Sequence, residues 1–220
     1  MLNKILLKIF GLRLIASQCG EDLILEALQP YKRNGFYVDV GANHPIKFNN
    51  TLLFYKKGWS GINIEPNHSR MWLFNFFRRR DINLNIGIGK EKSEIDFYVF
   101  KESTLSTFEK SASEEYQKMG HPLKKVIKIQ ILPLKEILEK HASQKEIDIL
   151  SIDTEGFDME VLESNDWNKF RPRFLIIETL EYRNDGTGKK LNEQFDPYME
   201  KIGYKKVAET YINTLYEKNY

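Results

Sequence analysis

The chain has little cysteine, no charge excess and no long apolar run, and each lack removes a class of protein. Its 220 residues include one cysteine, Cys19, so no internal disulfide can form. No cysteine–histidine spacing typical of a zinc site is present either. This pattern is typical of a reducing compartment, and we predict a cytoplasmic location.

The charges are nearly balanced. Lys and Arg number 33, Asp and Glu 31, and the formal net charge is +2. Such a balance gives no overall attraction to nucleic acid or to an anionic membrane, so we predict no nucleic-acid partner. The triplet Arg78–Arg80 is interpreted as the basic last turn of a helix over 67–80, which complements the helix dipole.

The most apolar terminal stretch, residues 1–16, is interrupted by Lys4, Lys8 and Arg13. It is too broken to span a bilayer, and no small-residue cleavage site follows it. We predict a helical extension whose apolar face packs on the domain, without stable membrane insertion. A weak interfacial anchor is the alternative, because its charges are basic. Residues 17–220 suit a single domain.

Apolar strand patterns alternate with helical ones along that domain. The expected helices cover 47–57, 67–80, 133–141 and 191–202, with another beginning at 158. The expected strands are 36–41, 59–65, 82–88, 94–100, 126–132, 147–152, 174–179 and a terminal antiparallel pair, 205–209 with 211–216. This order predicts a doubly wound α/β fold with a mostly parallel sheet. The polar stretch 101–124 is expected to be an inserted lid or binding loop.

In open parallel sheets, ligands bind beyond the carboxyl ends of the strands. Asp39 ends the first strand and is followed by Gly41, Ala42 and Asn43. The small residues allow close approach of a ligand, and amides at the next helix start can meet a carboxylate. Neither a Walker loop nor a GxGxxG pattern occurs here.

The next two strand ends support the same site. Glu65 closes the second strand, where one carboxylate can accept from both hydroxyls of a ribose. After the third come Asn85, Gly87 and Gly89, whose glycines suit a flat ring such as adenine. A β-turn into the next strand is the alternative for that segment.

Carboxylates follow the fourth and fifth parallel strands. Asp153 and Glu155 end one, and Glu178 ends the other. Several carboxylates at one rim are costly unless they meet a cation, a proton donor or helix amides. The alternative is that each is a helix cap or a solvated acid.

Taken in order, these segments resemble the FkbM family of S-adenosylmethionine-dependent methyltransferases. The similar segments are SQCGED (17–22), VDVGAN (38–43), INIEPN (62–67), LNIGIG (84–89), DILSIDTEGFDMEVL (148–162), FLIIETLE (174–181) and YINTLY (211–216). The resemblance implies a class I methyltransferase fold, a Rossmann-like sheet of seven strands with an antiparallel C-terminal hairpin.

The resemblance also implies residue roles. Asp39, Gly41 and Asn43, with Ala42 between them, would shape the pocket for the methionine half of the cofactor. Glu65 would hold the ribose, and Asn85 and Gly87 would face the adenine. Gln18, Glu21 and Asp22 would close over the cofactor or acceptor, and Asp153 would border both. The chain departs from the family at His44-Pro45, where many members have other residues.

Methyl transfer to a hydroxyl needs alignment and a base that takes the proton. The candidate bases are His44, Asp153, Glu155 and Glu178. Asp153, Glu155 and Glu178, with His44 as a further donor, could instead hold Mg²⁺ or Mn²⁺ that binds the acceptor oxygens. The resemblance implies O-methylation of a sugar or natural-product hydroxyl, in a surface-polysaccharide or secondary-metabolite pathway.

Three rival functions remain at this point. A nucleotide-sugar or NAD-dependent enzyme would share the sheet and Glu65, but it requires a GxGxxG motif in the first loop, which this sequence lacks. A nucleic-acid methyltransferase wants a basic, aromatic face, whereas Asp153–Gly156 is acidic. A non-catalytic cofactor-binding protein would keep the fold alone. The expected partner is a small acceptor, a sugar or sugar phosphate, and a homodimer is possible.

Overall fold

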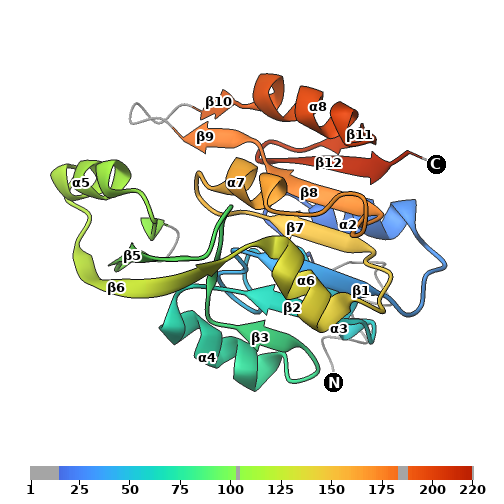
Figure 1. The fold of residues 1–220 in the computed structure, drawn as a ribbon, viewed down its shortest axis with the longest axis horizontal. Coiled ribbons are helices and arrows are strands. Elements are labelled where there is room, and N and C mark those ends of the chain that lie inside the picture. The colour runs from blue at the N-terminus through green and yellow to red at the C-terminus, as the bar shows by residue number, and fades with distance from the viewer. Residues whose placement is uncertain (1–14, 103–104, 183–187, 220) are drawn as a thin grey trace, which may run out of the picture.

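A seven-stranded sheet forms the centre of the molecule in a computed structural model, which describes residues 15–102, 105–182 and 188–219 (Figure 1). In spatial order its strands are β11 (Tyr204–Glu209), β12 (Asn213–Lys218), β8 (Phe174–Glu178), β7 (Ile149–Ile152), β1 (Phe36–Val40), β2 (Ser60–Ile64) and β3 (Ile82–Leu84). The strands β7, β8, β1, β2 and β3 run parallel. β12 is antiparallel to both of its neighbours. The predicted class I fold is confirmed.

Helices cover both faces of the sheet. They are α2 (Glu21–Leu28), α3 (Leu52–Lys56), α4 (His68–Phe77), α6 (Leu134–Ala142), α7 (Asp158–Glu163) and α8 (Asn192–Lys201). Side chains alternate along a strand, so Val38 and Val40 of β1 pack in the cluster that contains residues of α6, α7 and α8. Tyr37 turns to the opposite face, where α2 and α3 contribute Leu25 and Phe54. Asp39 therefore shares the face of Tyr37.

A second, smaller sheet stands beside the first. Its order is β4 (Gly87–Ile88), β6 (Leu123–Leu132) and β5 (Ser93–Phe100). The stretch 82–88, expected to be one strand, is divided between β3 and β4, which belong to different sheets. The division falls at Asn85, whose side chain donates to the carbonyls of Glu65 and Pro66. The chain thus leaves the main sheet at the end of β3.

The stretch 101–124 joins β5 to β6 and is more ordered than a loop. It contains α5 (Lys110–Lys118). β6 begins at Leu123, within the stretch expected to be a loop. In Figure 1 the β5–β6 hairpin and α5 project from the side of the molecule. A further antiparallel pair, β9 (Leu180–Tyr182) with β10 (Gly188–Lys190), precedes α8. The predicted extension over 1–16 lies, apart from Ile15 and Ala16, outside the described residues.

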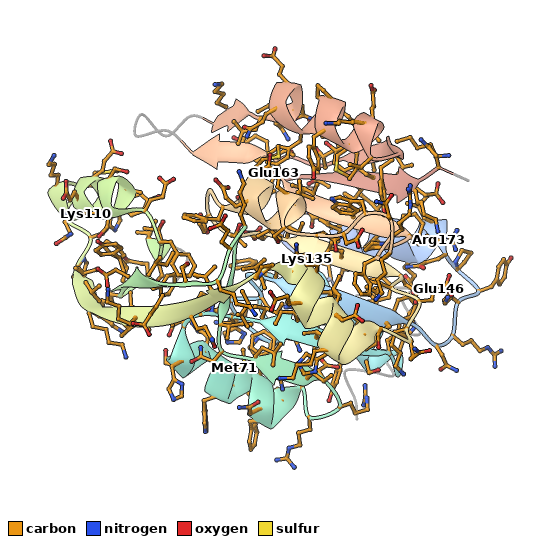
Figure 2. All side chains as sticks on the ribbon, in the orientation of Figure 1. Met71, Lys110, Lys135, Glu146, Glu163 and Arg173 are labelled. Atoms are coloured by element: carbon orange, nitrogen blue, oxygen red, sulfur yellow. The ribbon has the colours of Figure 1, made fainter. Side chains whose placement is uncertain are left out.

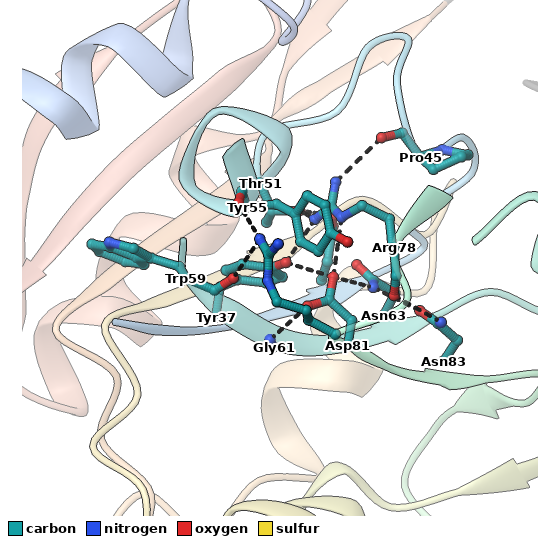
Figure 3. A network of polar contacts seen from close by, with 12 residues as sticks. Tyr37, Pro45, Thr51, Tyr55, Trp59, Gly61, Asn63, Arg78, Asp81 and Asn83 are labelled. Atoms are coloured by element: carbon teal, nitrogen blue, oxygen red, sulfur yellow. Dashed lines mark hydrogen bonds and ion pairs between the residues drawn. The ribbon is translucent and has the colours of Figure 1, made fainter. Parts of the chain in front are cut away.

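Arg78 is the anchor of a buried polar network rather than part of a solvated helix end (Figure 3). The helix ends at Phe77, and Arg78 is its cap, with 0% exposure. Its Nη2 donates to Tyr37 Oη and Thr51 Oγ1, its Nη1 to Pro45 O and Asn49 Oδ1, and its Nε to Asp81 Oδ2. The interpretation of the triplet as a basic last turn is therefore wrong for Arg78.

Within the described residues, no helix is long and apolar enough to cross a membrane. The longest described helices, α4 and α8, have 10 residues each, about half of what a bilayer needs.

Candidate active site at the carboxyl ends of the strands

A cavity opens at the carboxyl ends of β1, β2 and β7, where the sequence pattern predicts a ligand site. The hairpin and the start of α7 close its other side. Its lining residues are Val40, Gly41, Asn43, Ile64, Glu65, Pro66, Ile86, Gly87, Ile88, Phe97, Ser106, Phe108, Asp153, Thr154, Glu155 and Phe157. Six of the sequence-predicted site residues therefore meet in one cavity: Gly41, Asn43, Glu65, Gly87, Asp153 and Glu155.

Gly41 lines the cavity at a point where its backbone lies directly against the backbone of Asp153. Its φ is +76°, and a Cβ at this position would lie 1.7 Å from the carbonyl oxygen of Asp153. Only glycine fits such an approach. The amides of Gly41 and Ala42 both donate to Ile64 O, so this turn joins β1 to β2. These two amides are therefore already paired within the protein.

Glu65 is a buried carboxylate held by two backbone amides. Asn43 N donates to Oε2 at 2.8 Å, and Asn67 N donates to Oε1 at 2.7 Å. Burial raises the pKa of Glu65 to about 7, against the opposing effect of these bonds. The amides fix both oxygens toward the cavity edge, and each oxygen retains capacity for a further donor.

Asp153, Glu155 and Glu178 converge on one end of the site. One carboxylate oxygen from each lies within 4.8 Å of the others. Glu155 adopts a left-handed backbone conformation with φ 54°, which is uncommon for a non-glycine residue. The strained turn brings its exposed side chain back toward Asp153 and Glu178.

The proximity of these acids changes their ionisation. Burial, then the charge of Asp158, raises the pKa of Asp153 to about 7. Desolvation and the neighbouring carboxylates raise the pKa of Glu178 and Glu155 as well. Like charges this close resist simultaneous ionisation, so the three residues share protons as one group near neutral pH.

Asp158 also approaches the cluster but has another role. Its carboxylate accepts from the amides of Thr154 and Gly156. It therefore shapes the turn between β7 and α7 that carries Glu155.

Aromatic side chains also line the cavity. Phe108 lies between Phe97 and Phe157, with ring centroids 4.6 Å and 5.5 Å away. Gly87 lines the cavity beside Phe108, and a Cβ at Gly87 would lie 2.9 Å from that ring. The sequence pattern does not predict these rings, although Phe108 falls in the stretch 101–124 that is expected to be a binding loop.

Several predicted residues do not line the cavity. Asp39 is buried on the other face of the sheet and accepts from Asn49 Nδ2 and Thr51 Oγ1. Asp22 accepts from Ser17 Oγ and Ala16 N. Gln18 is exposed, and Ala42 packs against α4.

Glu21, His44 and Asn85 lie near the site with their polar atoms in use. Glu21 accepts from Thr210 Oγ1 and Asn213 Nδ2 and contributes to the negative field at Asp153. His44 Nδ1 accepts from the amides of Ile46 and Lys47. Burial, then Arg70 and Lys47, lowers the pKa of His44, so the ring is neutral at neutral pH.

Comparison with known proteins gives one family match. The sequence model for the methyltransferase FkbM domain matches residues 39–206. A search of curated protein sequences gives no match.

Among solved structures, the chain is similar to the small RNA methyltransferase HEN1, with 12% identity and a TM-score of 0.45, covering 94% of this chain and 27% of that one. It is also similar to a presumed O-methyltransferase from Klebsiella pneumoniae, with 11% identity and a TM-score of 0.46, covering 96% of this chain and 84% of that one. The chain thus spans about a quarter of the length of the first.

Proposed function

The chain belongs to the FkbM methyltransferase family, and on that premise we propose that it moves the methyl group of S-adenosylmethionine to a hydroxyl oxygen of a sugar-containing acceptor. The observation that carries this proposal is the mixed lining of the cavity. Asp153 and Glu155 line it together with the rings of Phe97, Phe108 and Phe157, and Glu178 lies in the same acidic cluster.

This lining suits the two halves of the cofactor. The adenine is flat and apolar on its faces, so it suits the part of the cavity lined by Gly87 and the rings of Phe97 and Phe108. The ribose diol would donate to Glu65, whose oxygens two amides already orient. The sulfonium is a cation, and it would lie toward Asp153, where negative charge lowers its free energy. Binding of that cation would in turn favour ionisation of the carboxylates.

The same carboxylates supply a base. The acceptor oxygen attacks the methyl carbon in line with the carbon–sulfur bond, and its proton must leave as the new bond forms. The pKa of Asp153 is raised to about 7, and a base works best when its pKa is near the operating pH. We assign proton removal to Asp153 and the positioning of Glu155 to its strained turn.

A second role is available to the same three side chains, namely to hold Mg²⁺ or Mn²⁺. All three offer oxygen ligands, which these ions prefer, and mutual repulsion among them would be relieved by a cation. Opposite ligands of Mg²⁺ lie about 4.2 Å apart, slightly less than the 4.8 Å limit of this cluster. A bound ion would polarise the acceptor hydroxyl.

Calorimetry and a methyl-release assay test the proposal. Titration with S-adenosylmethionine should show one site per chain, and Glu65→Gln should weaken it while the thermal midpoint stays within a few degrees. Acceptors that differ only in hydroxylation would then be assayed for methyl release. No cofactor binding would refute the proposal. Full activity in excess chelator would exclude the metal role and leave the base role standing.

A further inference from the structure

A basic cleft lies next to the cofactor cavity, and the roles assigned so far do not use it. It is formed by the start of α4 and by the end of the β5–β6 hairpin. Its lining residues are Asn67, Ser69, Arg70, Val99, Phe100, Lys101, Lys124 and Lys125. Four of these eight carry positive charge and none carries negative charge. An anion is therefore the ligand whose charge complements it.

The lysines of the cleft differ from others on the same hairpin. Lys128 of β6 pairs across the strands with Asp96 at 2.9 Å. For Lys101, Lys124 and Lys125, by contrast, no ion pair with an acid of the described residues is found. Like charges gathered without counter-charges repel one another, and a bound anion would remove that cost.

The strand geometry directs two consecutive lysines to the same place. Adjacent residues of a regular strand point to opposite faces. Here Val99 pairs with Lys125 and Phe100 pairs with Leu123, so Lys124 is an extra residue at a register shift. Such a bulge re-aims side chains, and Lys124 and Lys125 both line the cleft. Two lysines that line one cleft suit a group with several anionic oxygens.

The cleft and the cavity share a wall. Asn67 lines the cleft, and its amide donates to Glu65, which lines the cavity. Phe100 lines the cleft, and its amide donates to Ser106 Oγ, which also lines the cavity. Two hydrogen bonds therefore connect residues of the cleft to residues of the cavity.

We propose that this cleft binds the phosphate or diphosphate of the acceptor, so that the methylated sugar is carried as a phosphate ester. The assignment rests on the proposed function, because it treats the anion as part of the acceptor. A soluble nucleotide-linked sugar and a lipid-linked sugar both carry this group, and the shared diphosphate is what the cleft recognises.

Inorganic pyrophosphate is the probe. Its affinity would be measured by calorimetry at fixed ionic strength for the wild type and for Lys124→Gln/Lys125→Gln. We expect at least about tenfold weaker binding in the double variant, because two charge-assisted contacts are lost. The matched control is Lys110→Gln/Lys118→Gln on α5, which removes the same net charge away from the cleft (Lys110 is labelled in Figure 2). The control should bind pyrophosphate as the wild type does.

S-adenosylmethionine affinity, measured on the same samples, separates this inference from the proposed function. It should be equal in all three proteins. Displacement of pyrophosphate by a uridine diphosphate sugar would support a soluble acceptor, and displacement by vesicles that contain phosphatidic acid would support a lipid-linked one. Absent pyrophosphate binding, or equal binding in the double variant and its control, would overturn the assignment even if the cofactor binds. Preference for single-stranded RNA over pyrophosphate and the diphosphate sugar would also overturn it.

Discussion

Two polar clusters in this protein are organised in opposite ways. Around Arg78, a fully buried cation meets Asp81, and its five described donor contacts have acceptors from separate parts of the chain (Figure 3). Around Asp153, three carboxylates approach within 4.8 Å of one another. No cation of the described residues forms an ion pair with any of the three. The first cluster is electrostatically complete, and the second is not.

The difference indicates that the Arg78 network stabilises the fold, whereas the acidic cluster serves function. The Arg78 network ties β1, α3 and the loop after β1 together, so its value is already realised in the free protein. The acidic cluster raises the free energy of the free protein, and that cost falls when a cation or a proton arrives. Functional sites commonly keep such perturbed carboxylates. Five substitutions or conditions, in order of decreasing effect, test this contrast.

Arg78→Met should give the largest loss of stability. It leaves Asp81 buried without its partner, which costs about 3–5 kcal/mol. Urea unfolding measures the change. Arg79→Met is the matched control: Arg79 is exposed and contacts only Phe76 and its carbonyl among the described contacts, so a change below about 0.5 kcal/mol is expected. Similar losses for both variants would contradict the role given to Arg78.

Asp153→Asn should lower the activity while it raises the stability of the protein. We expect kcat to fall about 100-fold or more, as is usual for loss of a general base, while unfolding at pH 8 becomes harder by about 1 kcal/mol. Methyl-release kinetics and urea unfolding would be measured on one preparation. Glu163→Gln, at the end of α7 and outside the cavity, serves as the control. An active Asp153→Asn enzyme would break the contrast.

The pH dependence of stability should show the cost of burying carboxylates at this site. Burial and nearby acids raise the pKa of Asp153 from 3.8, and burial raises that of Glu65 from 4.5, each to about 7. The folded state therefore holds protons that the unfolded state has released, and stability falls as pH rises from about 4 to about 7. In Asp153→Asn this slope should be smaller. An equal slope in both proteins would mean that Asp153 ionises normally.

Phe108→Ala should weaken S-adenosylmethionine about tenfold, because one aromatic ring beside the adenine is lost. Phe108 is only partly buried, so the thermal midpoint should change little. Calorimetry gives the affinity. Phe76→Ala, an exposed ring on α4, is the control and should bind the cofactor normally. Unchanged affinity in Phe108→Ala would place the adenine elsewhere.

His44→Asn should have the smallest effect. An Asn oxygen can accept from the amides two and three residues on, as Nδ1 of His44 does. If the histidine only holds the turn, kcat stays within about threefold of the wild type at a saturating acceptor concentration. A fall of 100-fold, with the cofactor affinity intact, would instead make His44 the base.

Much of the fold could be predicted because it depends on periodicity. The runs at 36–41 and 147–152 are apolar throughout, and both became central strands. The run at 82–88 was misread, since its pattern continues through the point where Asn85 turns the chain into another sheet. Strand ends predicted Glu65 and Asp153 because parallel strands finish at one edge.

Other site features depend on tertiary paths that a single sequence does not encode locally. Phe108 reaches the cavity only because the hairpin folds back over it. Asp39 belongs to a segment that resembles the family motif. Its side chain, two residues after Tyr37, points to the same face of the sheet as Tyr37 and therefore away from the cavity. Arg78 belongs to a charged triplet, and its burial follows from acceptors contributed by Pro45, Asn49 and Thr51.

The division of the molecule into two sheets has a consequence for how new specificities arise. The cofactor's expected contacts at Gly41 and Glu65 follow strands of the seven-stranded sheet, whereas Lys124 and Lys125 lie on a strand of the smaller sheet. Exchanging residues 123–126 between relatives would therefore change these lysines and leave Gly41, Glu65 and Phe108 in place. Inheritance of acceptor preference could then follow this strand, while cofactor use descends with the rest of the chain.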